Sequence, residues 1–175
     1  LGGTTTGGTT TGGPITETAA TYTVPAGVTN VILGGSASQT ITANNLGDTI
    51  TSNNYGSTII GGTGNDTFIA GTGADHLTGG GGQDTFVFNS LPTKAGHITD
   101  FNTAQDVLDL SGIFSTIGYT GTNPLKNNWV SFVSDHHGNT NVYVNPHDGT
   151  GAHLVTTLDH VLPSSITTSD WIWHH

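Results

Sequence analysis

Apolar residues recur at every ninth position over a long stretch of this chain. A nine-residue frame that begins at Pro25 runs without a gap to Val87, and the first six places of most units are rich in Gly, Ala, Asn and Ser. The eighth place holds only apolar side chains: Ile32, Ile41, Ile50, Ile59, Phe68, Leu77 and Phe86. Six turn-forming residues followed by three extended residues are typical of short strands joined by tight turns. The pattern predicts an all-β solenoid in which the eighth side chain of each unit points inward.

Successive units are expected to alternate between the two edges of a flattened roll, so that eighteen residues complete one coil. Unit n then stacks on unit n+2, with the turns about 4.8 Å apart. The sixth place of the unit differs between the two edges, which carry Asp48, Asp66 and Asp84 at one edge and Gln39, Ser57, Asp75 and Thr93 at the other. Stacked carboxylates repel one another unless a cation lies between them. Ca²⁺ suits such a place because it prefers a cage of carboxylate and carbonyl oxygens.

Beyond the repeats the chain changes to longer alternating stretches at 129–134, 140–145 and 153–158, separated by Gly-containing turns. These stretches predict an antiparallel β meander, or sandwich-like cap, that closes the open end of the parallel β-roll. The expected organisation is a Gly/Thr-rich linker at 1–15, the calcium-binding roll with its following segment at 16–111 (repeats 25–87), and the cap at 112–175. The apolar tail at 169–173 is either a last core strand, a secretion signal region, or both.

Composition and charge exclude several classes of function. The chain has 27 glycines, no Cys and a formal net charge of −10, with only Lys94 and Lys126 as cationic side chains apart from His. A chain without a basic patch does not bind a nucleic-acid backbone, and one without Cys has neither disulfides nor thiolate metal sites. No apolar run reaches the about 20 residues needed for membrane insertion. The sequence also lacks HExxH, GxSxG and a Cys nucleophile, so we expect a non-catalytic module whose parent protein carries any catalytic residues before residue 1.

Three units, at 61–69, 70–78 and 79–87, match the nonapeptide G-G-x-G-x-D-x-U-x. The segments 98–101 (ITDF) and 106–111 (DVLDLS) are similar to the stretch that follows the repeats in serralysin-type proteases. The chain thus resembles the RTX (repeats-in-toxin) family, specifically the serralysin-type C-terminal region of type I secretion substrates. The resemblance implies a Ca²⁺-dependent β-roll that partners the type I secretion machinery and folds outside the cell in a secreted, extracellular protein.

The resemblance also implies which residues bind Ca²⁺. The first expected site combines the side chains of Asp66 and Asp84 with the carbonyls of Gly62, Gly64, Gly79 and Gly81. The second combines the side chains of Asp48 and Asp66 with the carbonyls of Asn44, Leu46, Gly61 and Thr63. A third would use Asp75 with the carbonyls of Gly71 and Gly73, and because Asp75 has no carboxylate neighbour in the repeat, Asp100 or Asp106 is a candidate partner. Asp-rich turns in a solenoid that hold no metal are the alternative.

Other functions stay open at this point. A Gly/Thr linker is common in front of carbohydrate-binding modules of secreted polysaccharide-active enzymes, and stacking faces for a polysaccharide could come from Tyr119, Trp129, Tyr143, Trp171 and Trp173. A variant is ice binding by the T-x-T pairs at 40–42 and 49–51. Two His-containing turns, at 135–137 and 147–148, could gather a transition metal. His174 and His175 are either native or the remnant of a purification tag.

Overall fold

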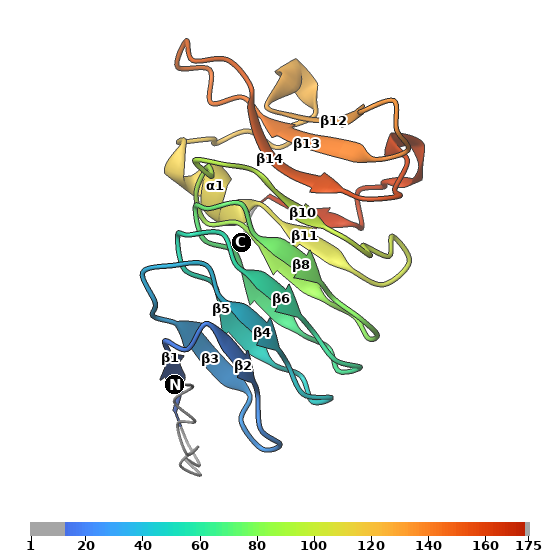
Figure 1. The fold of residues 1–175 in the computed structure, drawn as a ribbon. Helices are drawn as coiled ribbons and strands as arrows, with labels where there is room; N and C mark the ends of the chain where they lie inside the picture. Colours follow the sequence, from blue (N-terminus) through green and yellow to red (C-terminus); the bar gives the residue numbers. More distant parts are fainter. Residues whose placement is uncertain (1–12, 174–175) are drawn as a thin grey trace.

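The nine-residue units fold as three-residue strands joined by tight turns, and they build two parallel sheets that enclose a narrow apolar core (Figure 1). The structure is a computed structural model that describes residues 13–173. Within these residues the predicted all-β roll with an antiparallel cap is confirmed. Most of the predicted linker, residues 1–12, lies outside the described part of the chain, whereas Ile15 already begins a strand.

Two sheets make up the fold. In spatial order, the first sheet contains β1 (Ile15–Glu17), β3 (Asn30–Leu33), β5 (Thr49–Thr51), β7 (Thr67–Ile69), β9 (Thr85–Val87), β11 (Val107–Asp109) and β15 (Trp171–Ile172). The second contains, again in spatial order, β12 (Val130–Ser134), β13 (Thr140–Val144), β14 (His153–Leu158), β10 (Gly96–Ile98), β8 (His76–Thr78), β6 (Thr58–Ile60), β4 (Thr40–Thr42) and β2 (Thr21–Thr23). The helices are short: α1 (Ser111–Thr116) and the 3₁₀ turns Lys126–Asn128 and Pro163–Ser165.

The eighteen-residue coil predicted from the sequence sets the register of the parallel strands. Ile41 lies beside Ile59 in the second sheet, and Phe68 lies beside Phe86 in the first. All four side chains are buried, and the two Phe rings stack with their centroids 5.1 Å apart. The inward side chains form one continuous column because identical places in the unit repeat at every second strand.

The first unit of the repeat departs from the prediction. We expected Ile32 to point inward, but Ile32 is exposed, while Val31 and Leu33 on either side of it are buried. The pairing of Val31 with Ile50 explains the difference, because it places nineteen rather than eighteen residues between stacked positions. A one-residue change in spacing moves every side chain of a strand to its other face. The roll also begins earlier than the repeat, with β1 and β2.

The cap continues both sheets of the roll. Strands β12, β13 and β14 form the predicted antiparallel meander, and β14 then pairs in parallel with β10 of the roll. Strand β15 pairs in parallel with β11, and its Trp171 is buried, so the tail at 169–173 includes a core strand. Among the residues that the structure describes, no helix has the length and apolar character required to cross a membrane.

Candidate metal centre

The turns of the roll approach one another so closely that side chains would not fit at several glycines. A Cβ atom at Gly62 would overlap the carbonyl oxygen of Asn44, and one at Gly64 would overlap that of Leu46. One coil further along the roll, a Cβ atom at Gly80 would overlap the carbonyl oxygen of Gly62, and one at Gly82 would overlap that of Gly64. The carbonyl oxygens of places two and four therefore point from each turn towards the turn stacked on it, as a shared cation would require.

Aspartate side chains link successive turns along the edge that carries Asp48, Asp66 and Asp84, which we call the acidic edge. The Asp48 N–H donates to Oδ1 of Asp66 at 2.7 Å, and the Asp66 N–H donates to Oδ1 of Asp84 at 2.8 Å. The second oxygen of Asp66 accepts the N–H of Gly62 in its own turn, at 3.0 Å. Each carboxylate thus lies in the gap between two turns, where the prediction places the first two Ca²⁺ sites.

Asp106 extends this row by one more turn. The Asp84 N–H donates to Oδ1 of Asp106 at 3.0 Å, and Oδ2 of Asp106 accepts the N–H of Asn102. Asp100 lies in the same region, because it accepts the N–H groups of Gly79 and Gly80, both at 2.8 Å. Asp100 and Asp106 therefore lie beside Asp84 and not beside Asp75, so their suggested role as partners of Asp75 is wrong.

The acidic edge concentrates negative charge where water is largely absent. Asp48, Asp66 and Asp84 are each 1% exposed. Burial, together with neighbouring carboxylates, raises the pKa of Asp48 and of Asp84 to about 6; burial likewise raises the pKa of Asp66 and Asp106. Within residues 13–173 the ion pairs formed by His lie elsewhere, and neither Lys pairs with these carboxylates. A divalent cation would supply the missing positive charge.

Of the carbonyls expected as ligands from the sequence, five point into gaps between stacked turns: those of Asn44, Leu46, Gly62, Gly64 and Gly79. The carbonyl of Gly79 faces Gly61. The carbonyl in place one of the unit therefore points towards the preceding turn, whereas the carbonyls in places two and four point towards the following turn. The carbonyl of Gly62 also accepts the N–H of Gly81 at 3.0 Å, which leaves its second lone pair free. Gly81 packs against Thr63. Carboxylate and carbonyl oxygens from two turns thus surround each gap, and this oxygen-only donor set fits Ca²⁺.

Asp75 occupies a different setting at the opposite edge, which we call the amide edge. Oδ1 of Asp75 accepts the Ser57 N–H and the Ser52 hydroxyl, both at 2.7 Å, and Oδ2 accepts the Gly71 N–H at 2.9 Å. Burial raises the pKa of Asp75, and these three donors oppose the increase. In the next turn Thr93 donates its N–H and its hydroxyl to the carbonyl of Thr72. Asp66 accepts the two equivalent backbone N–H groups, so the Ser52 hydroxyl is the additional donor at Asp75 and occupies a position from which a cation could otherwise bind the carboxylate.

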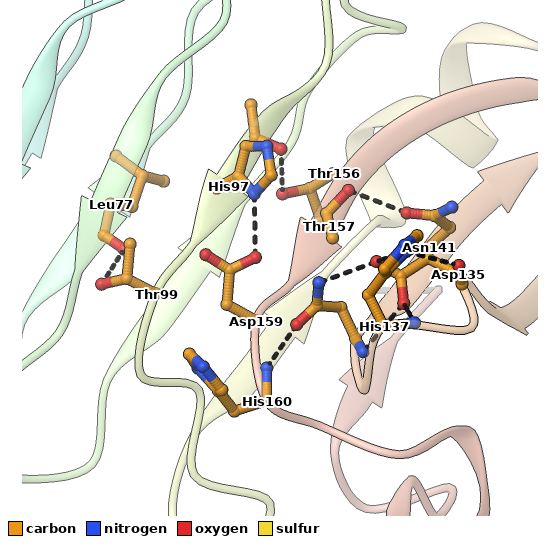
Figure 2. Close-up of polar contacts among 12 residues, drawn as sticks. Leu77, His97, Thr99, Asp135, His137, Asn141, Thr156, Thr157, Asp159 and His160 are labelled. Atoms are coloured by element: carbon orange, nitrogen blue, oxygen red, sulfur yellow. Dashed lines mark hydrogen bonds and ion pairs between the residues drawn. The ribbon is translucent and has the colours of Figure 1, made fainter.

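The histidines do not assemble the transition-metal site that the sequence left open. Figure 2 shows His97 of β10 bonded to Asp159 at the end of β14, at 2.8 Å, and His137 beside Asp135 in a separate turn. The ring of His147 instead lies against that of Trp129, with the centroids 4.5 Å apart and the planes tilted by 44°. In the part of the chain that the structure describes, no three His, Cys, Asp or Glu side chains gather into a metal-binding group. Any cation at the acidic edge must therefore use backbone carbonyls as well as carboxylates.

The chain is similar to known proteins in sequence and in fold. The peptidase M10 serralysin C-terminal family matches residues 37–162. The solution structure of the AlgE6R2 subunit of the mannuronan C5-epimerase from Azotobacter vinelandii is 25% identical, with a TM-score of 0.54, over 77% of this chain and 92% of that one. The AlgE6R3 subunit of the same enzyme is 20% identical, with a TM-score of 0.46, over 86% of this chain and 82% of that one. No curated protein sequence matches the chain.

Proposed function

Because the chain belongs to the family of peptidase M10 serralysin C-terminal domains, and is thus an RTX-type module rather than a catalytic part, we propose that Ca²⁺ binds between the turns of its acidic edge and stabilises the folded roll. The observation that supports this proposal is the row of buried carboxylates, in which each aspartate from Asp66 to Asp106 accepts a backbone N–H from the turn before it. Such a row is compact only if its charge is compensated.

We assign Ca²⁺ to three gaps along the acidic edge, each of which has a buried carboxylate on both sides. The first lies between Asp48 and Asp66, the second between Asp66 and Asp84, and the third between Asp84 and Asp106, with Asp100 beside it. When bound, Ca²⁺ would supply two positive charges to each gap. The gap at Asp75 offers one carboxylate whose oxygens already accept three hydrogen bonds, so we expect the weakest binding there.

The same charge distribution supports a role in type I secretion. Where free Ca²⁺ is scarce, as in a bacterial cytosol, repulsion between buried carboxylates opposes folding, so the chain stays unfolded and can be exported. At millimolar Ca²⁺ outside the cell, a site with a dissociation constant of about 10⁻⁴ M contributes about 1.4 kcal/mol, and linked sites add to this. We therefore propose extracellular folding of a secreted protein whose catalytic function lies outside this module.

A calcium titration tests the proposal. Circular dichroism should report a cooperative gain of β-structure as Ca²⁺ replaces EGTA, and equilibrium dialysis should find about three bound ions per chain. Mg²⁺ at the same concentration is the control, because it favours octahedral sites with several waters and should bind much more weakly. A melting curve that is identical in Ca²⁺ and in EGTA would contradict the proposal.

Polysaccharide binding is a second candidate. An open hollow of about 290 Å³ in the cap is lined by Tyr119, Trp129, Lys126 and neighbouring Asn and Thr residues, which combines aromatic faces with hydrogen-bonding groups. The similar AlgE6R2 structure is a subunit of an enzyme named for acting on mannuronan. A glycan array probed with the wild type and with Trp129→Ala tests this candidate, and equal signals for both proteins on every glycan would contradict it.

A further inference from the structure

The first gaps of the roll contain side-chain amides in the places where we propose cations later in the chain. In the gap between turns 34–39 and 52–57, Nδ2 of Asn53 donates to Oε1 of Gln39 at 2.9 Å and to the carbonyl of Ala37 at 3.0 Å, with the carbonyl of Gly35 at 3.4 Å. These acceptors occupy places two, four and six of their unit. Gly62, Gly64 and Asp66 occupy the same three places in a later unit.

The orientation of these amides follows from their other hydrogen bonds. The Tyr55 N–H donates to Oδ1 of Asn53 at 2.9 Å, and the Leu46 N–H donates to Oδ1 of Asn44 at 2.8 Å. A backbone N–H can only donate, so the atom it meets must be the amide oxygen. The nitrogen of each amide, with its two hydrogens, therefore points into the gap between the turns, where it carries a partial positive charge towards the oxygens.

Two further gaps are closed in the same way. Nε2 of Gln39 donates to the carbonyls of Glu17 and Ala19, at 3.0 and 2.9 Å. At the acidic edge, Nδ2 of Asn44 donates to the carbonyl of Val28 at 2.7 Å. The same nitrogen lies 3.2 Å from the carbonyl oxygen of Pro25 and 3.3 Å from Oδ1 of Asp48. All three amide-closed gaps involve turns that end by residue 57. In the turn of Asp106, Asn102 has the same position and its Oδ1 likewise accepts a backbone N–H, that of Ala104, but its Nδ2 donates to Gln105 of the same turn and not to the turn of Asp84.

We propose that the amide nitrogens of Gln39, Asn44 and Asn53 replace cations in the first three gaps of the roll, so that Ca²⁺ binds only further along the chain. A neutral amide can take this role because it donates two hydrogen bonds to oxygens that would otherwise face each other unpaired. The placement of the Ca²⁺ sites rests on the proposed function, whereas the structural role of the amides does not. The N-terminal coils are thus held by hydrogen bonds and the later coils by ions.

The first experiment converts an amide-closed gap into a cation site. The triple variant Gln39→Asp, Asn53→Gly and Ser57→Asp reproduces the arrangement of Asp66, Gly80 and Asp84 at the amide edge. Ser57 suits the change because its hydroxyl already accepts the Gln39 N–H, at 3.2 Å, as Asp84 accepts that of Asp66. Equilibrium dialysis with ⁴⁵Ca²⁺ should find one more bound ion per chain than in the wild type. A folded triple variant with the wild-type number of ions overturns the inference.

The second experiment uses single variants, which are expected to fold. Asn53→Ala removes the buried amide, and the control Asn54→Ala removes an exposed amide of the same turn, whose Oδ1 accepts a single N–H, that of Thr72, at 3.0 Å. Asn53→Ala should lower the Tm by roughly 2–4 °C relative to the control, by the same amount in EGTA and in Ca²⁺. Equal Tm values for the two variants overturn the inference. A wild type that binds no Ca²⁺ would instead refute the proposed function, and the comparison of these two variants would still test the amides.

Discussion

Replacing Asp66 with Ala removes the central carboxylate of the acidic edge. Oδ1 of Asp66 faces the turn of Asp48, and Oδ2 lies beside Gly61, which the carbonyl of Gly79 in the next turn approaches, so we expect two gaps to lose a ligand. Two N–H groups also lose their acceptor, the buried one of Asp48 and the partly buried one of Gly62. Loss of the acceptor typically costs about 1–3 kcal/mol for a buried group and less for a partly exposed one. Removal of a buried negative charge offsets part of this cost when no cation is bound, since burial already raises the pKa of Asp66.

The calcium-dependent part of the effect separates ligand loss from general damage. At free Ca²⁺ ten times above the dissociation constant, each site contributes about 1.4 kcal/mol, so loss of two sites lowers the calcium-dependent stability by about 3 kcal/mol. The assay is urea unfolding, followed by circular dichroism, at a series of Ca²⁺ concentrations. The slope of the unfolding free energy against the logarithm of free Ca²⁺ gives the number of ions bound on folding, and this number should fall by two in Asp66→Ala.

Asp148→Ala is the matched control because it removes an equal charge from an exposed turn, where the carboxylate bonds to Thr150. The control should keep the wild-type slope. If Asp66→Ala also keeps that slope, Asp66 is not a Ca²⁺ ligand and the assignment of the acidic edge is wrong. If Asp148→Ala loses as much slope as Asp66→Ala, the calcium dependence reflects net charge alone.

The opposite edge, the titration of the buried carboxylates and the close contact between turns each lead to a further prediction. Asp75→Ala should lower the unfolding free energy by about 2–4 kcal/mol, because three donors to the carboxylate lose their acceptor. The slope of the unfolding free energy against the logarithm of free Ca²⁺ should stay nearly unchanged; a loss of slope as large as that of Asp66→Ala would reverse the ranking of the two edges. Because the pKa of Asp48 and Asp84 is raised from 3.8 to about 6, the metal-free protein should lose stability as pH rises from about 4 to 7, by about 2 kcal/mol for each group, whereas added Ca²⁺ should remove or invert this trend in urea titrations. Gly64→Ala should reduce both stability and Ca²⁺ affinity in dialysis, since its Cβ would overlap the Leu46 carbonyl, and unchanged values would show that the turns can separate at no cost.

The regular part of the fold could be predicted because one period determines both the strands and their stacking. Seven apolar residues in the eighth place predicted the core, and six of them are buried. The exception, Ile32, lies where the spacing between stacked strands changes to nineteen residues, which no local pattern indicates. The longer strands of the cap were predicted from simple alternation, and their observed bounds agree to within one residue at each end.

The candidate site could be predicted only where the repeat stays regular. Asp106 continues the row of Asp66 and Asp84, but twenty-two residues separate it from Asp84 rather than eighteen, so a fixed frame does not find it. The role of Asn53 was missed for a different reason. In the sequence, an Asn where the repeat usually has Gly looks like a departure from the motif. Only the three-dimensional contacts show that the Asn53 side chain bonds to oxygens of the preceding turn.

The pairing of β11 with β15 determines how this module can be dissected. The strand that covers the C-terminal end of the first sheet is contributed by Trp171 and Ile172, and β14 likewise covers β10 in the second sheet. A fragment that stops at Ser111, where the repeat-like part of the sequence ends, would leave two bare strand edges and the apolar end of the core open to other molecules. Such edges promote aggregation and swapping of strands between chains. Truncated forms intended for crystallisation or for grafting onto another protein should therefore extend through Ile172.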